Sequence, residues 1–199
     1  ALLPVVEKSG AIWVGSSGRV RDNVSKDSFA EIESLGAGAL ALLDLPAAHY
    51  GGYYEGFANS ALWPALHSRN DLIKVSQDDY QSYREVNAFM ARALMRFNKP
   101  SAAFWIQDYH FLTLGAQMRD LGVRNPLGFF LHTPWPSRRV STQAWQVVAA
   151  PLSMRTAMSS GISRISDPQL DQRHGGHSPR PEAFQRHLDP VGVESHRRV

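Results

Sequence analysis

Two short apolar runs with an amphipathic stretch between them stand out in the hydrophobic pattern of the chain. Residues 102–106 and 127–131 are apolar runs of strand length, and residues 111–121 repeat apolar side chains at helical spacing before Gly122 ends the stretch. Two strands that are joined by a helix lie parallel in one sheet. The pattern therefore predicts a strand–helix–strand unit with parallel strands.

A second helix is predicted over residues 76–98. Its apolar stripe is Tyr83, Val86, Phe89, Met90, Ala93, Leu94 and Phe97. Ser76 followed by Asp79 fits a capping box at its start. Asn98–Lys99–Pro100 ends this helix and leads into the strand at 102–106.

Further elements are predicted on either side of a polar stretch near the start of the chain. Residues 11–15 and 37–45 have strand character, whereas residues 19–35 are polar and expected at the surface. Residues 57–67 predict a short helix that Pro64 breaks. Gly15–Ser16–Ser17–Gly18 follows the first strand, where it forms either a turn or a backbone cradle for a phosphate.

Polar residues follow both strands of the central unit. Gln107, Asp108, Tyr109 and His110 come directly after the first strand, and His132 follows the second. Ligands bind beyond the carboxyl ends of parallel strands, so we expect Asp108 and His132 to contact a polar ligand. A metal site with Asp108, His110 and His132, or a purely structural His132, are the alternatives. A Ser–His–Asp hydrolase is disfavoured because the chain has no Gly-x-Ser-x-Gly sequence.

Aromatic residues crowd the segment 48–67. Tyr50, Tyr53, Tyr54, Phe57 and Trp63 lie among glycines and an asparagine. Such a group either covers a core or builds a wall against a sugar, since Tyr and Trp combine an apolar ring with a polar atom. Trp13 is expected in the core by pattern alone.

Composition narrows the class of protein. The chain has 199 residues, 43% of them hydrophobic, and no cysteine, which excludes disulfides, a thiol nucleophile and a cysteine metal site. No apolar run approaches the length of about 20 residues that a membrane span needs. We therefore expect a cytoplasmic protein without a membrane partner.

The basic charge of the chain is concentrated at one end. Residues 1–137 contain 12 Lys and Arg against 13 Asp and Glu, whereas residues 138–199 contain 9 Arg against 5 Asp and Glu. A neutral body argues against a nucleic-acid partner. The arginine-, serine- and histidine-rich composition of 138–199 predicts a tail of low order.

Three strings in the first two-thirds of the chain resemble the N-terminal domain of the trehalose-6-phosphate synthase family, at spacings that also fit that family. They are GFANSALWPALH, FWIQDYHFLTLGAQMRDLGV and LGFFLHTPWPS, and IWVGSSG resembles the family's Trp-x-Gly-x-Ser-Gly turn. The resemblance implies an α/β fold in which residues 1–137 form part of the N-terminal Rossmann-like domain of a two-domain (GT-B) retaining glycosyltransferase. It also implies transfer of glucose from UDP-glucose to glucose 6-phosphate without a metal or other cofactor.

The resemblance further implies roles for five residues. Tyr54 and Trp63 match aromatic positions that line the glucose 6-phosphate pocket, and Trp13 matches a tryptophan near it. Asp108 matches an aspartate that hydrogen-bonds hydroxyls of the acceptor. His132 matches a histidine against the donor glucose, where catalysis consists mostly of positioning and electrostatic stabilisation.

Departures from the family pattern set further expectations. A first strand ending in Ser-Asn-Arg, a Gly-Gly loop and the second domain have no counterpart here, and residues after 137 do not continue the pattern. A reading-frame shift near codon 138 or a genuine extended tail would explain this, and sequencing the gene there distinguishes them. We expect the chain alone to be inactive and prone to aggregate. The alternatives are a non-catalytic module that binds a sugar phosphate or a full-length synthase, and a transferase with another acceptor.

Overall fold

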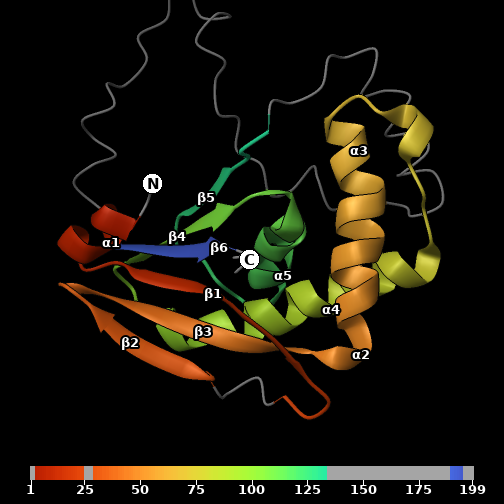
Figure 1. Ribbon diagram of the computed structural model, residues 1–199. Coiled ribbons are helices and arrows are strands. Elements are labelled where there is room, and N and C mark those ends of the chain that lie inside the picture. Colours follow the sequence, from red (N-terminus) through yellow and green to blue (C-terminus); the bar gives the residue numbers. More distant parts are fainter. Residues whose placement is uncertain (1–2, 25–28, 134–188, 195–199) are drawn as a thin grey trace, which may run out of the picture.

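The computed structural model describes residues 3–24, 29–133 and 189–194, and its centre is a six-stranded sheet (Figure 1). The strand order is β2-β3-β1-β6-β4-β5. The strands are β1 (Ile12–Arg21), β2 (Glu31–Leu35), β3 (Gly38–Pro46), β4 (Ala102–Gln107), β5 (Leu127–Phe130) and β6 (Asp189–Glu194). All neighbours pair in parallel except β2, which runs antiparallel along β3 at one edge. The carboxyl ends of the five parallel strands therefore share one edge of the sheet.

The central prediction from the sequence is confirmed. β4 and β5 are parallel, with Phe104 opposite Leu127 and Gln107 opposite Phe130. The connection contains a 3₁₀ turn, η4 (Tyr109–Phe111), and the helix α5 (Leu114–Asp120). Gly122 follows with a φ of 89°, a left-handed conformation that glycine adopts readily at the end of a helix.

The remaining helices precede β4. They are α1 (Leu3–Ser9), α2 (Ala47–Tyr50), the π-helix η1 (Gly51–Leu62), α3 (Trp63–Leu66), the 3₁₀ turn η2 (Asn70–Leu72), α4 (Gln77–Leu94) and the 3₁₀ turn η3 (Met95–Phe97). Ser76 caps α4 as predicted, because its Oγ accepts a hydrogen bond from the backbone N–H of Asp79. None of the helices in the part of the chain described here has the length and apolar character to cross a bilayer.

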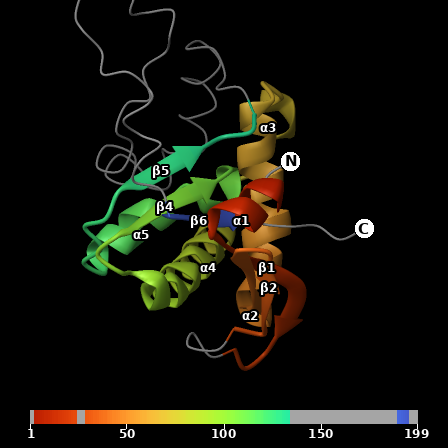
Figure 2. The ribbon, with the colours of Figure 1, turned by 90° about the vertical axis from the view of Figure 1, so that its left-hand side faces the viewer.

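The two faces of the sheet are covered differently. Val14 and its register partner Ala41 belong to the main core, together with residues of η1, α4 and α5. Trp13 and Leu40, one residue earlier, point to the other face, where Val6 of α1 covers them. Figure 2 shows α4 and α5 together on one side of β4 and β5.

The described residues of the stretch 19–35 lie mostly at the surface, as expected, and they include the end of β1 at Arg21 and the exposed edge strand β2. Two other expectations differ from the structure. Pro64 does not break its helix: α2, η1 and α3 run on without interruption. The carbonyl oxygen of Ser60, which an N–H at position 64 would bond in an α-helix, accepts a hydrogen bond from the N–H of Lys74 at 2.8 Å instead. Residues 189–194, expected within the tail of low order, form a strand inside the sheet.

The rest of the predicted tail, residues 138–188 and 195–199, lies outside the described residues. β6 pairs in parallel with β1 on one side and with β4 on the other. Ile12 of β1 and Phe104 of β4 are both opposite Val191. β6 therefore joins the half-sheet β2-β3-β1 to the half-sheet β4-β5.

Candidate functional site

Asp108 ends β4 in a backbone conformation that side chains rarely adopt. Its φ is 69° and its ψ is 168°, a region otherwise restricted almost to glycine. Its N–H donates to the carbonyl oxygen of Phe130 at 2.7 Å, and its Oδ1 accepts from the N–H of Tyr109 at 2.9 Å. The surrounding bonds thus hold a strained aspartate at the edge where ligands are expected.

Two buried polar side chains of α4 fix the turn that follows Asp108. The hydroxyl of Tyr83 donates to the carbonyl oxygen of Tyr109 at 2.7 Å and accepts from the N–H of Leu112 at 2.9 Å. The Nδ2 of Asn87 donates to the carbonyl oxygen of His110 at 3.1 Å. α4 therefore supplies hydrogen-bond partners to a buried turn whose own backbone pattern is irregular.

His110 lies between two aromatic rings. The ring of Tyr54 stacks on it at 5.5 Å and the ring of Tyr109 at 4.1 Å, measured between centroids. Its Nδ1 is 4.0 Å from Oδ2 of Asp108, and neither ring nitrogen has a hydrogen-bond partner among the described residues. Burial lowers the pKa of His110 to about 4, although the Asp108 carboxylate acts in the opposite direction. The imidazole is therefore neutral at physiological pH.

The continuous helix formed by α2, η1 and α3 contributes the aromatic segment. Tyr53 and Phe57 are fully buried in the core, and Tyr54 is partly buried beside His110. Trp63 is 40% exposed and stacks on His67 at 4.1 Å. One face of the helix is therefore core, whereas Tyr54 and Trp63 are partly or largely accessible, and a sugar wall formed by these two rings stays a prediction.

His132 lies at the end of the neighbouring strand. Its Nε2 is 3.1 Å from Oε1 of Gln107, and its ring meets Phe130 edge-on at 5.0 Å. Since Asp108 directly follows Gln107, and its N–H bonds to Phe130, the two predicted residues come from adjoining strand ends. The structure therefore brings Asp108, His110, Tyr54 and His132 to the carboxyl edge of β4 and β5.

Trp13 has a different environment. It is 7% exposed and packs with Val6 and Ala11 in the smaller apolar cluster beneath α1. This is the packing role that the pattern alone favoured. Its proximity to a sugar-phosphate pocket stays a prediction.

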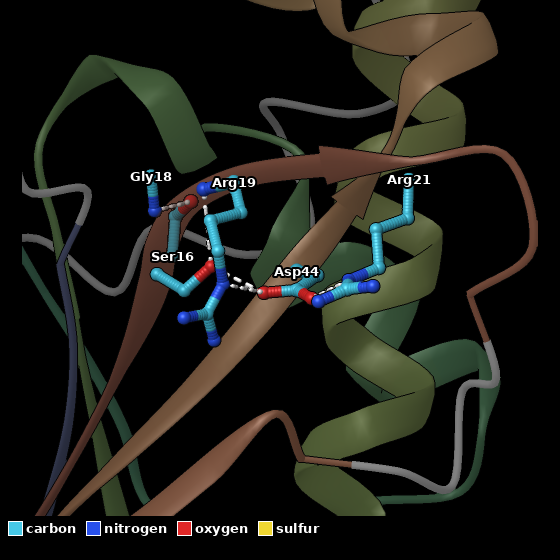
Figure 3. Close-up of polar contacts among 6 residues, drawn as sticks. Ser16, Gly18, Arg19, Arg21 and Asp44 are labelled. Atoms are coloured by element: carbon cyan, nitrogen blue, oxygen red, sulfur yellow. Dashed lines mark hydrogen bonds and ion pairs between the residues drawn. The ribbon is translucent and has the colours of Figure 1, made fainter.

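The segment Gly15–Gly18 is bound within the fold (Figure 3). Ser17 Oγ donates to Oδ1 of Asp44 at 2.5 Å, and the N–H of Gly18 donates to Oγ of Ser16 at 3.1 Å. Arg19 pairs with Asp44 at 3.0 Å and Arg21 pairs with the other carboxylate oxygen. This segment is neither a turn nor a free phosphate cradle: it is an irregular part of β1 that is fastened to β3.

Asp44 is a buried carboxylate with three donors. Burial raises its pKa, but the hydrogen bonds from Ser17, Arg21 and Arg19 outweigh this effect and leave the pKa below its ordinary value. The two arginine side chains are more than half exposed, so water screens their charges. The arrangement ties the carboxyl-terminal half of β1 to its neighbour β3.

An open cavity of about 350 Å³ lies at the carboxyl ends of β1 and β3. It is lined by Asp22, Asn23, Val24, Pro46, Ala48, His49, Glu85, Phe89 and Arg92, none of which was predicted as a site residue. Within the part of the chain that the structure describes, no three imidazole, thiol or carboxylate groups gather in a way that could hold a metal ion.

Four residues of the edge were not singled out as ligand-site residues from the sequence. Tyr83 was read only as a core position and His110 only as a metal ligand, and Asn87 and Gln107 were assigned no role. Asn87 and Gln107 carry a detectable signal, because each is a carboxamide within an otherwise apolar pattern. A buried carboxamide in a folded protein normally forms hydrogen bonds, so its position in an apolar pattern points to a polar partner nearby.

The family model of glycosyltransferase family 20 matches residues 1–143. A trehalose-6-phosphate synthase from Sinorhizobium fredii (strain NBRC 101917 / NGR234) is 39% identical over 132 residues, which are 65% of this chain and 28% of that protein. The chain thus spans under a third of the length of this relative.

Two solved structures from Burkholderia xenovorans share the fold. One, a UDP-forming alpha,alpha-trehalose-phosphate synthase, has a TM-score of 0.69 and 36% identity, over 79% of this chain and 34% of that one. The other, a UDP-forming synthase in complex with glucose-6-phosphate, has a TM-score of 0.64 and 30% identity, over 75% of this chain and 34% of that one.

Proposed function

Because the chain belongs to glycosyltransferase family 20, we propose that it is part of a UDP-forming trehalose-phosphate synthase, which transfers glucose from UDP-glucose to glucose 6-phosphate. Within that enzyme these residues contribute the N-terminal, Rossmann-like side of a GT-B site. The similarity to a synthase in complex with glucose-6-phosphate supports this acceptor.

The strained backbone of Asp108 is the observation that carries the proposal. A non-glycine residue at this φ and ψ destabilises the fold by about 1–3 kcal/mol, and such strain persists where the side chain has a function. Its carboxylate lies 4.0 Å from the His110 imidazole, which is flanked by Tyr54. An acceptor oxygen that can hydrogen-bond hydroxyls beside aromatic faces suits a hexose.

Asp108 and the neutral groups around it would orient the acceptor sugar. Tyr54 and the exposed Trp63 would offer ring faces to its C–H groups, and Trp13 would lie near the same pocket. His132, on the adjoining strand end, would face the donor glucose. Transfer would then depend on holding the two sugars in register and stabilising the charge that develops between them, rather than on a protein nucleophile.

Calorimetric titration of the full chain with glucose 6-phosphate tests this assignment. We expect binding that weakens at least about tenfold, equivalent to roughly 1.4 kcal/mol, in Asp108→Gly. The same substitution should raise the thermal midpoint, because glycine adopts the required conformation without strain. Asp71→Ala, which removes an exposed carboxylate paired with Arg69, is the control. Unchanged binding in Asp108→Gly would refute the role of Asp108.

We also propose that the 199-residue chain alone does not catalyse glucose transfer, since it spans under a third of its relatives' length. Formation of trehalose 6-phosphate from UDP-glucose and glucose 6-phosphate by the purified chain would disprove this.

Association with a full-length synthase is the alternative function of such a chain, and co-purification would test it. Cytoplasmic location stays a prediction that cell fractionation can test.

A further inference from the structure

Gln107 is a buried carboxamide at a strand end. It is 2% exposed, although it follows the apolar run of β4 and lies opposite Phe130. Side chains alternate along a strand, so Gln107 shares a face with Trp105, and His132 shares a face with Phe130. Burying a polar group in such a position is unfavourable unless it is hydrogen-bonded.

The bond that compensates this burial crosses from one strand end to the next. Oε1 of Gln107 lies 3.1 Å from Nε2 of His132. Nε2 of Gln107 is buried and has no hydrogen-bond partner among the described residues. The carboxamide is therefore held mainly through the imidazole, and the imidazole contacts both Gln107 and the ring of Phe130.

This contact determines which ring nitrogen of His132 carries the proton. A carbonyl oxygen only accepts hydrogen bonds, so Nε2 of a neutral imidazole bonded to it must be the N–H donor. Nδ1 is then left as an acceptor, suited to a hydroxyl group. In the opposite amide orientation the NH₂ group would face an unprotonated Nε2 and Nδ1 would carry the proton, so the tautomer of His132 reports which way the amide lies.

We propose that Gln107 is a positioning residue that fixes the tautomer and the orientation of His132, leaving Nδ1 free to accept a hydrogen bond from a sugar hydroxyl. The identity of that sugar rests on the proposed function. The relation between Gln107 and His132 does not, since it follows from the geometry of β4 and β5 alone.

The positioning role and a purely structural role predict different stabilities for Gln107→Leu. Leucine has a similar volume and no polar atoms to bury, so under the positioning role the variant should keep or raise the thermal midpoint. A purely structural role for the Gln107 bond predicts a lower thermal midpoint. If Gln107→Leu leaves the fold intact and changes only the state of the His132 imidazole, then Gln107 acts by positioning that imidazole. Stability and the state of His132 are therefore measured on the same variants.

Proton–nitrogen NMR of the imidazoles in the full-length chain provides the test. His132→Asn identifies the His132 signals by their loss. His132 is exposed to solvent, so its ring nitrogens are observed through the carbon-bound ring protons, which do not exchange. We expect a single Nε2–H tautomer that becomes a mixture of the two tautomers in Gln107→Leu while the melting curve is retained. Gln107→Glu should restore the single tautomer, because a carboxylate also only accepts and forms a stronger bond. Gln81→Leu, on the exposed face of α4 and bonded to Glu85, should leave it unchanged.

Three results would overturn the proposal. They are a neutral His132 protonated on Nδ1, a single Nε2–H tautomer that persists unchanged in Gln107→Leu, and a Gln107→Leu chain that no longer folds. None of these depends on binding of glucose 6-phosphate. Failure of the proposed function, seen by calorimetry, is therefore distinguishable from failure of this inference.

Discussion

At the scale of single residues, His110 makes the fold sensitive to acid. Burial lowers its pKa from 6.5 to about 4 against the opposing effect of Asp108. The unfolded chain therefore binds a proton between these two values that the folded chain does not. Stability that is fully present above pH 6.5 is lost as the pH falls toward about 4, by roughly 3 kcal/mol over the window.

His110→Phe is expected to remove this loss. A phenyl ring keeps the stack with Tyr54 and Tyr109 and has no nitrogen to leave unpaired, so stability at neutral pH should be kept or raised. Urea unfolding at several pH values between 4 and 6.5 would show a flatter pH dependence. Asp44 does not interfere in this pH range. Its pKa is lowered from 3.8, so the stability that it contributes is lost only as the pH falls below 3.8. His67→Gln at the surface is the control, and an unchanged slope in His110→Phe would contradict the assignment.

The sequence predicted that Asp108 and His132 come together at the carboxyl edge of β4 and β5, but it did not predict the contacts around them. Asp108 and His132 were located because parallel strands end at one edge, a rule that needs no knowledge of side-chain direction. The strain at Asp108, the stacking of His110 and the support from Tyr83 and Asn87 depend on how α4 packs against the 109–112 turn. Such packing joins residues more than twenty positions apart and leaves no local pattern.

At the scale of elements, the helix that carries Tyr54 approaches α4 closely through two glycines. A methyl group at Gly56 would lie 2.5–2.7 Å from the Asp79 carboxylate, and one at Gly52 would lie 2.8 Å from Ser82. Gly51, in the same helix, has open space around it and a helical φ of −59°. The glycines at 52 and 56 therefore set the distance between the two helices.

Alanine substitutions in this helix should act in opposite directions. Gly52→Ala is expected to destabilise the chain by about 1–3 kcal/mol, because the Cβ of Ser82 is fixed to the backbone of α4 and cannot turn away from the added methyl group. Gly51→Ala is expected to stabilise it by up to about 1 kcal/mol, since alanine favours the helix and meets no neighbour. Thermal unfolding of both variants measures this. Equal effects would show that helix propensity, rather than close packing, governs the position.

The same helix shows where local rules stop. The sequence predicted that residues 57–67 of this segment are helical and that Ser76 caps α4. It did not predict the π-helical register of η1 or the continuation of the helix past Pro64. Proline breaks a helix only where a backbone N–H at its position is needed as a donor, and that depends on the register of the preceding turn. β2 was missed for a similar reason: it is an exposed edge strand whose side chains follow no apolar alternation.

At the scale of the whole molecule, the sheet depends on a strand from the far end of the chain. β6 lies between β1 and β4 and pairs with both, so the two halves of the sheet meet through it. Composition placed residues 189–194 in a tail of low order, because a six-residue segment with Pro190 and Gly192 carries a weak strand signal. Pairing on both sides supplies what the segment's own propensity does not.

Val191→Pro tests whether this strand holds the molecule together. Proline removes a backbone donor and does not fit between two paired neighbours, so it is expected to separate β2-β3-β1 from β4-β5. The thermal transition should broaden or divide, and the amides of β1 and β4 should exchange with solvent much faster. Val191→Thr keeps the N–H and the β-branched shape and should unfold like the unchanged chain. Equal protection of β1 and β4 in both variants would mean that the half-sheets are stable without β6, and residues 12–130 would then be the folding unit.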